Sequence, residues 1–120
     1  MIDQDSVPST IEKAVQSIVE RLTDNDKASI LDSNASQHHF SVGRYIRNEW
    51  SLWSHDSPLK RDAAETYKIA HPDDISGLIL DWVFALVKEE DFDPQQCCER
   101  FHNHWKAYNQ TSLEAGNYKC

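Results

Sequence analysis

Apolar residues recur along much of the chain at the intervals of three and four positions that are typical of amphipathic helices. The first such stretch predicts a helix over 10–23, whose apolar positions are Ile11, Val15, Ile18 and Leu22. Ser9 and Glu12 stand at its start with the spacing of a capping box. After a polar break, a second, shorter turn or helix is predicted over 27–31.

The stretch 40–53 is apolar on more than one side, which predicts a helix that runs through the middle of the fold. Its main stripe consists of Val42, Ile46, Trp50 and Trp53. Gly43 would let a neighbouring element approach closely. Ser57 and Pro58 then have the order of an N-cap and a first helical residue, so a polar helix is predicted from there to Tyr67.

The strongest pattern follows the tetrapeptide His-Pro-Asp-Asp at 71–74, because proline and acidic residues are favoured in the first turn of a helix. It predicts the core helix over 73–89, with apolar positions Ile75, Leu78, Ile79, Trp82, Val83, Leu86 and Val87. Asp93 and Pro94 start a last helix. Its expected inward face carries Cys97, Phe101, His104, Trp105 and Tyr108.

These elements predict an all-α fold, a compact bundle of five to six helices in a single domain, since no stretch shows the alternation of a strand. The helical domain is expected over 9–109, between a flexible N-terminus at 1–8 and a flexible C-terminal tail at 110–120. No apolar run approaches the roughly 20 residues that cross a bilayer. The acidic N-terminus does not have the organisation of a secretory signal, so a cytoplasmic location is expected.

The chain carries 20 acidic and 12 basic residues, for a formal net charge of −8. Such a charge opposes binding to nucleic acid and to anionic membranes, so neither is expected as a partner, whereas it would speed association with a basic protein. Two of the three cysteines, Cys97 and Cys98, are adjacent, and Cys120 is the last residue. A disulfide framework is therefore not expected.

The residues that could carry chemistry do not form a known catalytic or metal-binding pattern. His102 and His104 are two positions apart on a predicted helix and point away from each other, and Cys98 with His102 supplies only two ligands. No metal and no cofactor are predicted. The chain also has no nucleophile elbow, phosphate-binding glycine loop or His-Glu-x-x-His motif, so it is not expected to be an enzyme.

One polar cluster is predicted where the middle helix would cross the start of the core helix. Its members are Arg44, Arg47, Asn48, His71, Asp73 and Asp74. In the structural interpretation, the two aspartates stabilise the dipole of their own helix and Arg47 pairs with one of them. In the functional interpretation, the cluster forms a pocket for an anionic group or for side chains of a partner.

Four tryptophans are many for a chain of 120 residues. Trp82 is expected in the core, whereas Trp50, Trp53 and Trp105 are candidates for partial exposure. An exposed tryptophan with polar neighbours is typical of binding hot spots, so Trp50 and Trp53 join the candidate binding residues.

The pattern Ile-Arg-Asn at 46–48 with Leu-Trp at 52–53, followed by His-Pro-Asp-Asp at 71–74, resembles an uncharacterised family of small bacterial helical domains. The resemblance covers about 40–86 and continues more weakly to Trp105. It implies that Arg47, Asn48, His71, Asp73 and Asp74 matter, without assigning them a role.

Charge, size and the missing catalytic motif together favour an intracellular protein-protein interaction module, and within that class an acidic immunity or antitoxin-like inhibitor of a basic toxin. The alternatives are a small-ligand-binding regulatory domain and an enzyme that uses His71, Asp74 and Arg47. The partner's identity and the oligomeric state stay open.

Overall fold

The computed structural model describes residues 8–33 and 58–116. Within these ranges the chain is all-α and has no strand, which confirms the predicted fold class. The helices are α1 (Ile11–Arg21), α2 (Asp24–Leu31), α4 (Pro58–Asp62), the π-helical turn η3 (Ala63–Tyr67), α5 (Pro72–Val87), α6 (Pro94–Lys106) and α7 (Ser112–Ala115). No described helix is both long and apolar enough to cross a membrane.

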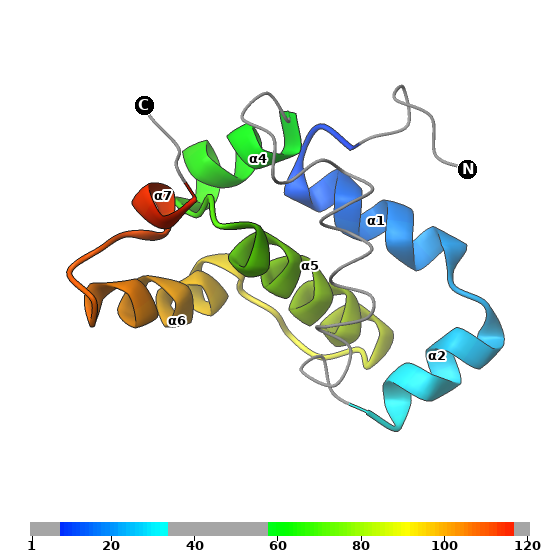
Figure 1. The fold of residues 1–120 in the computed structure, drawn as a ribbon. Helices are drawn as coiled ribbons and strands as arrows, with labels where there is room; N and C mark the ends of the chain where they lie inside the picture. Colours follow the sequence, from blue (N-terminus) through cyan, green and yellow to red (C-terminus); the bar gives the residue numbers. More distant parts are fainter. Residues whose placement is uncertain (1–7, 34–57, 117–120) are drawn as a thin grey trace.

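Helix α5 is the centre of the fold (Figure 1). Helices α1 and α2 pack on one side of it and α6 packs on another, while α4 and α7 lie near its N-terminal end. Its residues Ile75, Leu78, Ile79 and Val83 are almost completely buried, as the core helix of the sequence pattern predicts. Ile11, Val15 and Leu59 join them in one core cluster.

The helix starts explain most of the observed boundaries. Thr10, and not Ser9, caps α1, because its hydroxyl accepts the Lys13 N–H at 3.1 Å. A second partner comes from far along the chain, since Asp62 Oδ2 accepts the Ile11 N–H at 2.8 Å. The four N-terminal N–H groups of a helix need such acceptors. The carboxylate of Asp62 therefore fixes the start of α1 against the end of α4.

Helix α2 begins three residues earlier than the pattern predicts. Thr23 and Asp26 form a reciprocal capping box, in which each side chain accepts the backbone N–H of the other residue. The run that we expected to break the chain is therefore the start of a helix. Asp26 keeps its ionised form because the hydrogen bond from the Thr23 backbone lowers its pKa.

Three packing expectations are wrong in detail, the first being that Leu86, an expected core position of α5, is 45% exposed. Trp82 is half-buried, not a core residue, and its ring stacks on Phe92 with centroids 5.7 Å apart. On α6 the buried side chain is Cys98, whereas His104 is exposed and Tyr108 is 66% exposed. Cys97 and Phe101 of the expected inward face do pack against the core, and Trp105 reaches Asp74, so the pattern was wrong only for His104 and Tyr108 and missed Cys98.

The folded chain continues past the boundary that we expected at Asn109. Thr111 caps α7 by accepting the Glu114 N–H, and Ser112 and Gly116 are buried. Helix α7 forms because of its tertiary contacts, since a helix of four residues is too short to be stable alone. The predicted helix over 40–53 lies outside the described residues, and so do Arg44, Arg47, Asn48, Trp50 and Trp53.

Candidate functional site

The start of α5 holds the three predicted site residues that the structure describes, His71, Asp73 and Asp74. His71 is the N-cap, and its Nδ1 accepts the Asp73 N–H at 3.1 Å. The imidazole lies against the ring of Trp105, with centroids 5.3 Å apart. Asp73 is half exposed, whereas Asp74 is buried. The tetrapeptide therefore starts the helix, as predicted, and sends one carboxylate into the fold.

The buried carboxylate of Asp74 joins three helices. Its Oδ2 accepts hydrogen bonds from Trp105 Nε1 of α6 and Ser112 Oγ of α7, both at 2.7 Å. The Ser112 oxygen in turn accepts the backbone N–H of Ala70 at 3.1 Å. A buried carboxylate needs such donors to offset the cost of leaving water. This geometry is that of a structural anchor.

Helix α7 is held by two further contacts. The buried Lys60 Nζ donates to the Gly116 carbonyl oxygen at 2.9 Å, and burial lowers the pKa of this lysine. Gly116 itself lies so close to the backbone of Ala70 that a Cβ placed on it would be 2.3 Å from the Ala70 carbonyl carbon. We call the contacts of Asp74, Trp105, Ser112, Gly116 and Lys60 the C-terminal clamp.

The sequence contained a signal for α7 that we did not use. Thr111 and Glu114 have the spacing of a capping box, Thr-x-x-Glu, and the structure forms the bond from the Glu114 N–H to the Thr111 hydroxyl. Nothing in the local pattern indicated that Ser112 would bind Asp74, which lies 38 positions away.

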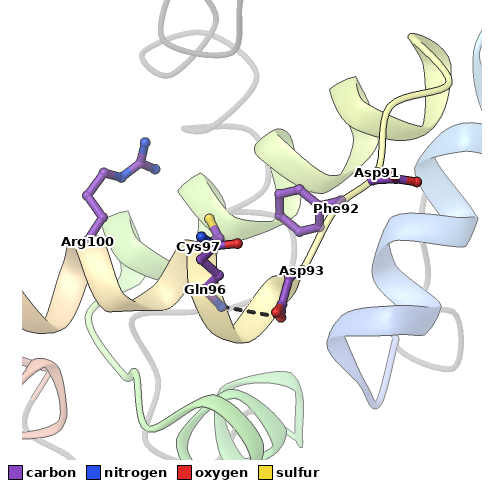
Figure 2. A pocket seen from close by; sticks show the side chains of 6 residues that line it. All are labelled: Asp91, Phe92, Asp93, Gln96, Cys97 and Arg100. Atoms are coloured by element: carbon purple, nitrogen blue, oxygen red, sulfur yellow. Dashed lines mark hydrogen bonds between the residues drawn. The ribbon is translucent and has the colours of Figure 1, made fainter.

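A hollowed surface lies at the other end of α5, where the chain turns back into α6. Two adjoining hollows of about 340 Å³ and 310 Å³ share the lining residues Asp91, Phe92 and Arg100. We call the pair the corner groove. In Figure 2, Cys97 and Arg100 project from α6, and the Phe92 ring lies between the connecting loop and that helix.

The corner groove is mainly acidic around an aromatic side chain. Four carboxylates line it, those of Asp81, Glu90, Asp91 and Asp93, against the two basic side chains of Lys88 and Arg100. The ammonium of Lys88 donates to the carbonyl oxygen of Ser33, just after the end of α2, at 2.7 Å. Clustered carboxylates on a concave surface concentrate negative potential. This groove therefore favours cationic groups.

Asp81 is the best-connected residue of the corner groove. Its Oδ2 accepts a hydrogen bond from Arg100 Nη2 at 2.6 Å and one from Cys97 Sγ at 3.4 Å. The Arg100 guanidinium also lies over the Phe101 ring, 4.9 Å from its centroid. The Asp81 carboxylate thus already binds the guanidinium of Arg100, whose side chain is 65% exposed.

Neither described cysteine has the properties of a nucleophile. Burial, followed by the charge of Asp81 and the hydrogen bond to it, raises the pKa of Cys97 to about 12. Burial and then the charge of Asp74 raise the pKa of Cys98 to about 12 as well. Both residues are therefore protonated thiols at neutral pH, and only the thiolate reacts.

This protonation predicts slow alkylation in the native protein. At pH 8, Cys97 and Cys98 are expected to react with iodoacetamide at least about 10-fold more slowly than in urea. Mass spectrometry of the tryptic peptide 89–100 measures both rates. Asp81→Asn removes a charge that raises the Cys97 pKa, so it should accelerate Cys97 and leave Cys98 slow. Equal native and unfolded rates would contradict the burial of these thiols.

A third hollow, of about 270 Å³, lies between α1, α2 and α5. Its lining is almost entirely apolar, with Asp26 and Ser29 as the polar residues. The Asp26 carboxylate is already used to cap α2. The corner groove offers more convergent polar groups and is the stronger candidate for a binding site.

Comparison with known proteins finds a matching family model. A family model described as a domain of unknown function (DUF6794) matches residues 7–85. This range includes most of the stretch in which we noted a resemblance, as well as α1, α2 and nearly all of α5. No curated protein and no solved structure matches the chain significantly.

Proposed function

The chain belongs to this family, the domain of unknown function DUF6794, and we propose that it is a protein-protein interaction module whose corner groove receives a basic segment of a partner protein. The observation that carries the proposal is the combination of Phe92 with four surrounding carboxylates in one hollowed surface. Aromatic side chains supply contact area at interfaces, and complementary charge supplies orientation and a fast association rate.

The net charge of the chain supports the same partner class. A formal charge of −8 attracts a basic protein over distances of about a Debye length, roughly 8 Å at physiological salt. Within that range the corner groove adds a local excess of negative charge. Long-range attraction and local contact would therefore favour the same orientation of the partner.

We propose further that the partner is a basic toxin and that this chain acts as its immunity or antitoxin-like inhibitor in the cytoplasm. Support comes from the small size, the acidic charge and a groove that would accept a basic surface. An inhibitor of this kind works by covering the partner's surface, so the proposal assigns binding, and no catalysis, to the chain.

The alternatives at the start of α5 receive less support. A ligand-binding or catalytic use of His71, Asp74 and Arg47 requires an accessible carboxylate. The Asp74 Oδ2 already accepts two hydrogen bonds, and the residue is 7% exposed. The carboxylate therefore has little surface left for a substrate.

The test is affinity capture of the partner with matched charge variants. Wild-type protein, Glu90→Gln/Asp91→Asn in the groove and Glu12→Gln/Glu20→Gln on α1 are immobilised and exposed to native cell lysate. All four side chains are exposed, and both variants remove two negative charges. We expect a basic partner whose recovery falls about tenfold with the groove variant only, and whose binding weakens as salt rises.

Two outcomes would count against the proposal. A partner recovered equally by the groove variant and the α1 variant would place the contact elsewhere on the surface. If no stoichiometric partner were recovered at low salt, the proposal that the chain is an interaction module would be contradicted.

A further inference from the structure

Arg100 is the basic lining residue that binds a carboxylate of the corner groove. It lines both hollows, and its Nη2 lies 2.6 Å from Asp81 Oδ2. The same guanidinium lies over the Phe101 ring. A carboxylate beside an aromatic face is an arrangement that proteins use to recognise arginine. The groove thus binds an arginine side chain of its own chain.

The ion pair between Arg100 and Asp81 is weak enough to be replaced. The Arg100 side chain is 65% exposed and that of Asp81 is 24% exposed. Ion pairs between exposed side chains contribute little to stability because water and salt screen them. Asp81 also accepts a hydrogen bond from Cys97, which does not depend on the guanidinium for its donor. When another guanidinium replaces Arg100, the ion pair that Asp81 loses is therefore formed again with the new side chain.

We propose that Arg100 is an internal occupant of the corner groove, which an arginine side chain of the partner displaces from Asp81. The inference rests on the proposed function and adds the class of side chain that is recognised and the competitor that it must replace. When the partner's arginine binds Asp81, Arg100 turns outward into solvent.

Arginine suits this site better than lysine. A guanidinium is planar and can donate to Asp81 while it stacks on an aromatic ring, whereas an ammonium is a compact and strongly hydrated charge. Arg100 shows both contacts at once, to a carboxylate and to Phe101. A partner segment with arginine should therefore bind more tightly than the same segment with lysine.

The experiment compares two substitutions that change the net charge equally. Arg100→Gln removes the internal occupant, and Arg61→Gln removes an exposed arginine of α4. The probe is a fluorescein-labelled hexa-arginine peptide, with hexa-lysine as the second probe, and affinity is measured by fluorescence anisotropy at low salt. Circular dichroism checks that each variant is folded.

Arg100→Gln is expected to bind hexa-arginine about 3- to 10-fold more tightly than Arg61→Gln, because only the first substitution removes a competitor. In an Asp81→Asn background this difference should disappear, and hexa-lysine should show a smaller gain. Equal affinity of the two arginine variants, or a gain that persists without the Asp81 charge, would overturn the inference.

The proposed function has a separate readout in the same assay. If Glu90→Gln/Asp91→Asn weakens hexa-arginine binding and Glu12→Gln/Glu20→Gln does not, the groove is a cationic binding site whatever Arg100 does. If those two variants bind equally, both the groove and its internal occupant are ruled out.

Discussion

Asp74→Ala is expected to lower the free energy of unfolding by about 3 kcal/mol, because it removes the acceptor of one buried and one partly buried hydrogen bond. Trp105 Nε1 and Ser112 Oγ would both lose their partner at 2.7 Å. Donors that stay buried without an acceptor carry the full cost of lost hydration. Urea unfolding followed by circular dichroism measures the change.

Asp73→Ala is the matched control for this substitution. It removes a carboxylate from the same first turn of α5, but from a side chain that is half exposed. Its contribution to the helix dipole is worth about 0.5 kcal/mol. If Asp74→Ala were as stable as Asp73→Ala, the C-terminal clamp would not be a structural anchor. Loss of partner binding in a stable Asp74→Ala variant would restore a functional role for the tetrapeptide.

Gly116→Ala is expected to destabilise the domain by about 3 kcal/mol, in the range of severe overpacking. The added Cβ would lie 2.3 Å from the Ala70 carbonyl carbon, 2.4 Å from its oxygen and 2.6 Å from the His71 nitrogen. These are backbone atoms, so they cannot move aside as a side chain can. The φ of Gly116 is −87°, which alanine adopts without strain. The substitution therefore tests the close approach alone.

Gly77→Ala on α5 is the control for Gly116→Ala. Its Cβ would meet only the ring of Phe101, at 3.2 Å, and this partly buried side chain can shift. Alanine also has a higher helix propensity, by up to about 1 kcal/mol. We expect this variant to be near or slightly above wild-type stability in the same urea titration. Similar losses for both glycines would show that α7 does not dock as closely as described.

The sequence predicted those helices whose apolar period and start residues lie within the helix itself. Helix α5 could be found because its apolar positions repeat over four turns and because a proline and two acidic residues mark its start. Helices α1 and α6 were found in the same way. Helix α7 was not, because four residues contain no period and its stability comes from Asp74 and Lys60.

The candidate site was harder to predict than the helices. The run 88–93 has the charged pattern of a solvated face, and Glu89 and Glu90 are exposed. The groove arises because Phe92 stacks on Trp82 and Arg100 reaches Asp81 from the next helix. Both contacts depend on how α6 turns back along α5, and no local pattern encodes that angle.

Asp74 was correctly predicted to be important, but only part of its role was predicted. In the structural interpretation we expected Asp73 and Asp74 to stabilise the dipole of their own helix and one of them to pair with Arg47, which lies outside the described residues. The position of Asp74 in the first turn is confirmed. The hydrogen bonds from Trp105 and Ser112 were not foreseen, because they connect residues 31 and 38 positions apart.

Helix α4 links two distant parts of the chain. Asp62 at its end binds the start of α1, 51 positions earlier, and Lys60 binds Gly116, 56 positions later. A helix of five residues cannot nucleate by itself in water. Contacts over such separations also form only after long loops have closed, at a large cost in chain entropy. Helix α4 is therefore expected to be stable only together with its contacts to the start of α1 and to Gly116.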